Sequence, residues 1–299
     1  MSMPYTAPQD EMLHLTLRGG QARVLLCRTT NLSQKAADIH CPSDTACAAL
    51  SRLMSGTLML GVQLKGQNDS VTVTIAGNGP IGKMTAVAHP DGTVKVTADY
   101  PQTDVPKRAD GHLNVGGLVG KKGRMTVVKD LGLKEPYVGQ VNLVSGELGE
   151  DFAQYFTVSE QTASLVALGA RVRDGLLLSC GGILIQAMPG CSEDLLEQLE
   201  VRSMLFADIS RELAENDLLD LANTWLEGLE PELVGRQPLS FRCDCSREKM
   251  ERALIALGRE ELQDIIDVDQ ETALTCHFCR TSQHFSRDEL IQLLESASD

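Results

Sequence analysis

The first two thirds of the chain alternate hydrophobic and polar residues in a way that is typical of β-strands. The alternation runs through residues 14–17, 71–75, 94–97 and 125–128. A period of two suits strands that bury one face, and turns rich in Gly and Pro, such as residues 77–80, separate them. The pattern predicts a large, mainly antiparallel sheet between residue 12 and about residue 186.

Helical periodicity interrupts these strands twice. Residues 43–64 carry small and apolar side chains on most faces, so this helix should be buried against a sheet. A second helical region, residues 147–160, precedes strand-like residues 164–172 and 176–178. The fold class expected for residues 1–190 is therefore α+β.

From Ser192 onward the period becomes helical. Ser192 is a good helix cap, and leucines recur at steps of three and four residues. Between Ser192 and Gly235 there are twelve Asp or Glu and two Arg. This acidic helical linker, residues 191–237, either packs on the first domain as ordinary helices or stays marginally folded because its charges repel.

Four cysteines dominate the last quarter, residues 238–299. Cys243 and Cys245 form one close pair, and Cys276 and Cys279 form another thirty residues later. Two such pairs can converge on one tetrahedral centre, and four thiolates form the closed shell typical of structural zinc. The alternatives are unrelated core cysteines or a catalytic Cys-x-x-Cys, which lacks its βαβ context here. His277 and His284 are interpreted as surface or second-shell residues because the four thiols already fill the shell.

The module around these cysteines is small. Helices are expected at residues 248–257, 259–266 and 286–296, the last of them with a capping box at Ser286 and Glu289. About sixty residues barely bury a self-sufficient core, so loss of zinc should unfold the module. Cys-x-Cys and Cys-x-x-Cys can each close into a disulfide, and the bridge from Cys243 to Cys245 should be strained and easily reduced.

Charge and composition exclude several classes of protein. The net charge of −14 opposes binding to nucleic acid, and no apolar run is long enough to span a membrane. Residues 1–11 do not read as a signal peptide. Nine cysteines without an export signal indicate a reducing cytoplasm.

Other residues with reactive side chains do not form a recognisable catalytic motif. The Gly- and Lys-rich residues 116–123 lack the hydroxyl residue of a phosphate-binding loop and are interpreted as a flexible hairpin connection. Ser159, Glu160 and His112 have no nucleophile-elbow motif around them. No role is assigned to the remaining cysteines, Cys27, Cys41, Cys47, Cys180 and Cys191.

Several motifs together resemble the 33 kDa chaperonin family, the bacterial redox-regulated heat-shock holdases. They are residues 77–82, 137–141, 145–147, 155–156, 159–161 and 181–186 with Pro189, followed by the two cysteine pairs. The resemblance covers nearly the whole chain.

This resemblance implies an ATP-independent holdase, not an enzyme, that binds unfolded or partly folded clients under oxidative and heat stress. The reduced form would hold one Zn²⁺ per chain through Cys243, Cys245, Cys276 and Cys279 and be inactive. The oxidised form would be an active homodimer with disulfides joining Cys243 with Cys245 and Cys276 with Cys279. It also implies that residues 1–190 bind clients and dimerise, and that residues 238–299 are the redox switch.

Two departures from the family pattern stand out. Residues 95–98 replace an Arg-Gly-Tyr common in relatives, and Gln283 stands where relatives often have Tyr. The first departure is expected to affect domain packing or the dimer surface. The second is expected to change how firmly the module binds zinc. The competing functional hypotheses are a thiol-disulfide oxidoreductase that uses Cys276 and Cys279, and a zinc-stabilised nucleic-acid-binding module, which the acidic charge opposes.

Overall fold

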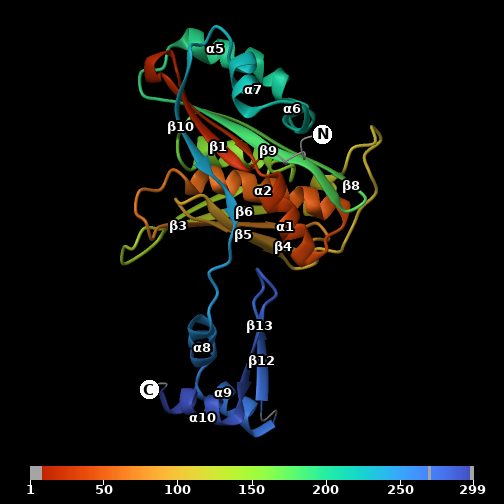
Figure 1. The fold of residues 1–299 in the computed structure, drawn as a ribbon, viewed down its shortest axis with the longest axis vertical. Coiled ribbons are helices and arrows are strands. Elements are labelled where there is room, and N and C mark those ends of the chain that lie inside the picture. Colours follow the sequence, from red (N-terminus) through yellow and green to blue (C-terminus); the bar gives the residue numbers. More distant parts are fainter. Residues whose placement is uncertain (1–8, 269–270, 297–299) are drawn as a thin grey trace, which may run out of the picture. The chain divides into compact units, whose positions relative to one another are not determined.

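The computed structural model describes residues 9–268 and 271–296. The chain divides into two compact units, with the boundary between Arg242 and Cys243 (Figure 1). The third region was expected to begin at residue 238. Residues 238–242 instead belong to the first unit, because Ser240 and Phe241 pair with one of its strands.

The first unit contains two sheets. The five-stranded sheet has the order β10-β1-β2-β9-β8 and is antiparallel throughout. Its strands are β1 (Glu11–Leu17), β2 (Ala22–Arg28), β8 (Ser164–Arg173), β9 (Leu176–Ala187) and β10 (Pro231–Pro238). Strand β10 takes up the end of residues 191–237, which were expected to form a helical linker, and extends to Pro238. Pairing with the edge of β1 supplies hydrogen-bond partners that outweigh the local pattern.

The second sheet has six strands in the order β11-β5-β4-β3-β6-β7. They are β3 (Ser70–Gly77), β4 (Lys83–Ala88), β5 (Thr93–Ala98), β6 (Gly123–Asp130), β7 (Tyr137–Asn142) and β11 (Ser240–Phe241). All pairs are antiparallel except β11 with β5. The α+β class with antiparallel sheets is confirmed, with the strands divided between two sheets.

Helix α2 (Asp44–Gly61) lies between the two sheets, beside α1 (Thr30–His40) (Figure 1). Almost every residue of α2 is buried, as its apolar pattern predicts. Small residues allow close approach: a Cβ on Gly56 would lie 2.4 Å from the ring of Phe152 in α4 (Gly149–Val158). Residues 116–123 begin as the short buried helix α3 (Val115–Val119), so the expected hairpin connection is wrong there.

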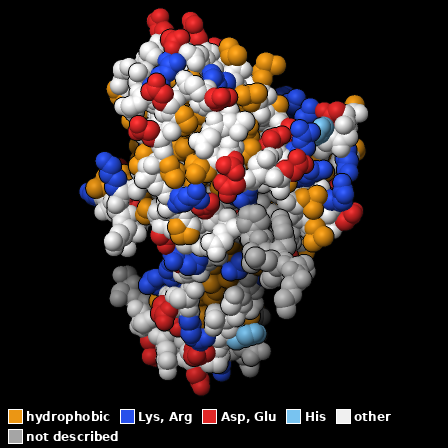
Figure 2. Space-filling view, turned by 45° about the horizontal axis from the view of Figure 1, so that its top comes forward, with side chains coloured by type: hydrophobic (Ala, Val, Ile, Leu, Met, Phe, Trp, Pro, Cys, Tyr) orange, Lys and Arg blue, Asp and Glu red, His pale blue; other side chains and the backbone are white. Residues whose placement is uncertain are grey.

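The acidic segment covers the outer face of the five-stranded sheet. Its elements are α5 (Glu193–Arg202), η2 (Ser203–Phe206), α6 (Ile209–Glu215) and α7 (Leu218–Trp225). Their buried leucines, with Phe206 and Trp225, form one cluster with sheet residues such as Leu15 and Ile185. Acidic and hydrophobic side chains intermingle on the exposed side at the top of Figure 2. The helices therefore pack on the first unit.

The second unit contains α8 (Arg247–Ala256), α9 (Arg259–Val268), the hairpin β12 (Glu271–Thr275) and β13 (Ser282–Ser286), and α10 (Arg287–Ser296). The three helices match the prediction, and the hairpin between α9 and α10 is additional. The capping box is confirmed, because Ser286 N–H donates to Glu289 Oε2 at 2.8 Å and Glu289 N–H donates to Ser286 Oγ at 3.5 Å.

Candidate metal centre

Four sulfur atoms meet in the second unit. The Sγ atoms of Cys243, Cys245, Cys276 and Cys279 all lie within 4.8 Å of one another. Two of these contacts join the two motifs: Cys243 Sγ lies 3.7 Å from Cys276 Sγ, and Cys245 Sγ lies 3.3 Å from Cys279 Sγ. The chain thus brings together the four thiols that the sequence singles out.

Local backbone structure fixes the position of each pair of thiols. Cys243 and Cys245 directly precede α8, whose cap Ser246 accepts a hydrogen bond from Lys249 N–H at 3.3 Å. Cys276 and Cys279 lie in the tight turn between β12 and β13. The N–H of Cys276 donates to Thr281 O and the N–H of Arg280 donates to Cys276 O, each at 2.9 Å. Helix start and hairpin turn therefore present both pairs to one point.

Arg247 joins the elements that carry the thiols. Its guanidinium lies 4.4 Å from the centre of the Phe285 ring and 2.6 Å from Glu289 Oε1, and it donates to His284 O at 3.0 Å. This one side chain links α8 to β13 and α10. It thereby holds the first cysteine pair near the second.

The donor set fits a metal ion. A tetrahedral ion with bonds of about 2.3 Å to sulfur places its ligands about 3.8 Å apart, which is compatible with four Sγ atoms that all lie within 4.8 Å of one another. Four soft thiolates leave no open position for water. His277 and His284 are exposed and do not belong to the group of potential ligands, in agreement with their interpretation as surface residues.

Burial and hydrogen bonding shift the pKa values of these thiols in opposite directions. Burial raises the pKa of Cys243 to about 11 and raises that of Cys245 as well. Burial also acts on Cys279, but hydrogen bonds from Thr281 and from the neighbouring thiols outweigh it and lower its pKa to about 6. Metal binding to the free thiols at neutral pH must therefore release protons.

The five remaining cysteines lie elsewhere. Cys27, Cys47 and Cys180 are buried in the core between the sheets, and burial raises the pKa of all three, that of Cys47 to about 12. Cys41 is exposed and Cys191 half-buried. Within residues 9–268 and 271–296, none of the five belongs to a group of potential metal ligands.

The hydroxyl and imidazole candidates have structural contacts. Glu160 pairs with Lys129 and accepts a hydrogen bond from Tyr155 Oη at 2.9 Å. The backbone N–H of His112 donates to Asp110 Oδ1 at 3.0 Å. Ser159 lies near Tyr137 at the end of α4. These contacts hold loops and strands together.

The fold and the site together define a class of protein: an α+β unit followed by a small module that gathers four cysteine thiols. The family model described as "Hsp33 protein" matches residues 10–286, and the chain belongs to this family. The resemblance recognised in the sequence is therefore confirmed.

Named relatives agree with this assignment. The chain is 40% identical over 288 residues to the 33 kDa chaperonin of Alkaliphilus metalliredigens, covering 96% of this chain and 99% of the relative. The 33 kDa chaperonin of Clostridioides difficile is 38% identical, with 96% and 99% covered. The crystal structure of the heat shock protein 33 homolog of Thermotoga maritima matches with a TM-score of 0.87 at 31% identity, covering 97% and 99%.

Family membership supports a chaperone role, with unfolded client proteins as partners. Across the described parts of the chain, no helix combines the length and the apolar character needed to cross a membrane.

Proposed function

We propose that this chain is a redox-regulated, ATP-independent holdase of the cytoplasm, which prevents aggregation of unfolding proteins under oxidative and heat stress. In the reduced, inactive form, one Zn²⁺ would be held by Cys243, Cys245, Cys276 and Cys279. The observation that carries this proposal is the convergence of these four thiols within a unit that has little other means of staying folded.

The core of the second unit is small and is in contact with the thiol cluster. Its described buried residues are Met250, Leu254, Leu262, Ile266, Phe285, Leu290 and Leu294. Cys245 and Cys276 pack against this core. Structural zinc contributes roughly 10 to 16 kcal/mol of apparent free energy in small thiolate sites, while whole domains are stable by about 5 to 15 kcal/mol. Loss of the ion would remove the main stabilisation of this unit.

Oxidation would remove the ligands. Each thiol pair loses two electrons and two protons as a disulfide forms, and each molecule of hydrogen peroxide takes them up and becomes two molecules of water. The proposed disulfides, Cys243 with Cys245 and Cys276 with Cys279, follow the family resemblance. All four Sγ atoms lie within 4.8 Å of one another, so peptide mapping of the oxidised protein must decide the pairing.

Unfolding of the second unit would loosen the acidic segment, which precedes it in the chain. Strands β10 and β11 connect α7 to Cys243. Beneath the acidic helices lies the outer face of the five-stranded sheet, with buried residues such as Leu13, Leu26 and Ile183. Release of the acidic helices would uncover this broad apolar face for clients, and for a second copy of the chain in the proposed oxidised homodimer.

The test measures aggregation of a heat-denatured client by light scattering, with reduced and peroxide-treated protein, while released zinc is followed with a colorimetric chelator. Suppression should appear only after oxidation, in step with release of one zinc per chain. Cys41→Ser, a substitution of an exposed thiol outside the cluster, is the matched control and should behave like the unmodified protein. Equal suppression by the reduced and oxidised forms would contradict the switch.

A thiol-disulfide oxidoreductase is the second candidate, favoured by the low pKa of Cys279, which resembles that of a reactive thiol. The Cys276 to Cys279 motif lies in a hairpin turn, however, and not at a helix N-terminus of the kind that activates such thiols. Catalytic turnover in an insulin-reduction assay would support this alternative.

A further inference from the structure

Arg28 is a buried cation at the end of β2, the middle strand of the five-stranded sheet. Only 5% of the residue is exposed. Removing a guanidinium group from water is unfavourable unless its N–H groups find acceptors and its charge finds a partner. The groups that the Arg28 side chain contacts therefore decide whether its burial is tolerated.

The side chain of Arg28 donates hydrogen bonds to the acidic segment. Its Nη2 lies 3.1 Å from Leu213 O and 2.5 Å from Asn216 O, although these residues are 185 and 188 positions away in the sequence. Leu213 lies in the last turn of α6, and Asn216 directly follows the helix. Within residues 9–268 and 271–296, Arg28 Nε has no acceptor. The hydrogen bonding of this buried cation thus depends on α6.

Helix α6 lacks a cation of its own at this end. It has seven residues, and its C-terminal half contains Glu212 and Glu215 but no basic residue in the last turn. The last carbonyl groups of a helix have no partner within the helix and lie at the negative end of its dipole, so acidic side chains there are unfavourable. Arg28 supplies the missing donors and positive charge from another element.

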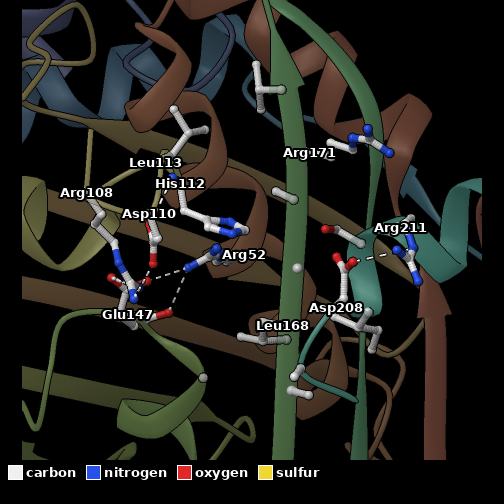
Figure 3. Close-up of a pocket in the computed structure, with 18 of the residues that line it drawn as sticks. Arg52, Arg108, Asp110, His112, Leu113, Glu147, Leu168, Arg171, Asp208 and Arg211 are labelled. Carbon is white, nitrogen blue, oxygen red and sulfur yellow. Dashed lines mark hydrogen bonds and ion pairs between the residues drawn. The ribbon is translucent and has the colours of Figure 1, made fainter. Parts of the chain in front are cut away.

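The start of α6 contacts different strands. Asp208 and Arg211 line a groove of about 650 Å³ together with Arg171 of β8 (Figure 3). The hydroxyl of Ser179, in β9, donates to Ser210 O. The two ends of the helix are therefore held separately, the start by β8 and β9 and the end by β2.

The end of α6 also packs closely on the sheet. A Cβ built on Gly181 of β9 would lie 2.8 Å from Leu213 Cδ1, and Leu213 is buried. Apolar packing of this kind is non-directional. Two hydrogen bonds from one planar guanidinium, in contrast, fix the position of the groups that accept them. Arg28 therefore contributes the directional part of the contact.

We propose that Arg28 is a positioning residue that holds α6, and with it the acidic segment, on the five-stranded sheet of the reduced protein. Undocking of α6 would return the guanidinium and both carbonyl groups to water, and this hydration offsets part of the lost hydrogen bonding. Such a contact selects one docked position while adding little stability. That property suits a segment that must leave on oxidation, a role that rests on the function proposed above.

Hydrogen exchange of the full-length, reduced and zinc-loaded protein tests this role. Arg28→Met keeps the unbranched stem and removes the charge and the donors, so amides of α6 should exchange about tenfold faster or more. Arg28→Lys retains a cation that can donate to a carbonyl, and its exchange rates should stay within about threefold of those of the unmodified protein. Unchanged exchange of α6 in Arg28→Met would overturn the proposal.

Arg23→Met is the matched control on the same strand. Arg23 is half-buried and donates to Gln63 and Gln186, neither of which belongs to the acidic segment, so α6 should exchange at the unmodified rate. Exchange in β3, β4 and β6 and the zinc content should be the same in all variants. Faster exchange of β3, β4 and β6 in Arg28→Met would show that Arg28 stabilises the whole first unit, which overturns its specific role.

Client aggregation, measured with the same variants, separates this proposal from the proposed function. If α6 helps to cover the client site, reduced Arg28→Met should suppress aggregation without peroxide while it keeps its zinc. If α6 of Arg28→Met exchanges faster but the reduced variant stays inactive, Arg28 still positions α6, and the acidic segment is not the cover of the client site.

Discussion

Asp10 is a buried carboxylate that supports the start of helix α1. Its Oδ1 accepts a hydrogen bond from Asn31 N–H at 3.0 Å and its Oδ2 accepts one from Leu32 N–H at 2.6 Å. Only 7% of the residue is exposed. Burial is the largest influence and raises the pKa of Asp10 to about 6, although these hydrogen bonds and the charge of Arg28 oppose it.

The raised pKa predicts how stability depends on pH. Because the folded protein binds the proton of Asp10 more tightly than the unfolded chain does, the contribution to stability is complete below pH about 4 and is lost as the pH rises toward about 6. Asp10→Asn keeps an acceptor and removes the titration. The free energy of unfolding of the unmodified protein, relative to this variant, should fall by up to about 3 kcal/mol across that window.

Urea unfolding of both proteins at pH 4, 5, 6 and 7 measures this difference. Other groups titrate equally in the two proteins and cancel. A difference that stays constant with pH would contradict the raised pKa of Asp10.

At the scale of elements, the acidic segment combines good packing on one face with charge repulsion on the other. Trp225 is 5% exposed, and its ring meets that of Phe206 edge-on with the centres 5.3 Å apart. Ten of the fourteen net negative charges lie between Ser192 and Gly235. Self-repulsion weakens the segment, so it depends on the apolar cluster beneath it.

Trp225 reports on this segment because the chain contains one Trp. If oxidation releases α5 to α7 from the sheet, the emission of Trp225 should shift to longer wavelength as its ring enters water. The shift should follow zinc release, and it should be absent from protein that is kept reduced by excess reductant. Complete zinc release with unchanged emission would show that the acidic segment stays folded.

Elements with a strong local pattern were predictable. Helix α2, the strands around Leu15 and Val127, and the helices of the acidic segment follow directly from hydrophobic periodicity. Helix α1 and strand β10 do not follow from periodicity. The carboxylate of Asp10, 22 residues before Leu32, stabilises the start of α1, and pairing with β1 stabilises β10. The hairpin of β12 and β13 was missed because its short strands carry little alternation.

At the scale of the molecule, the two units have separate cores. The cluster between the sheets of the first unit contains no residue of the second, whose described core residues form their own cluster. Loss of metal should therefore act on the second unit first, and on the acidic segment only through the chain that connects them.

Metal removal with a chelator under reducing conditions tests this order by hydrogen exchange. Amides of α8, α9, β12, β13 and α10 should lose protection, those of α5 to α7 should lose part of it, and those of β3, β4 and β6 should keep it. Protection should return when zinc is added back. Simultaneous loss across β3, β4 and β6 would show that the two cores are not independent.

The sequence by itself determined the α+β class, the buried central helix, the acidic segment and the four thiols of the candidate metal centre, because local periodicity and the close spacing of cysteines carry these features. Only the tertiary structure decided that the strands form two sheets around α2, that β10 joins the first of them, and that Gly149 at the start of α4 lies against β8. These features depend on contacts between segments far apart in the chain. The hydrophobic pattern of one strand does not indicate which other strand it pairs with.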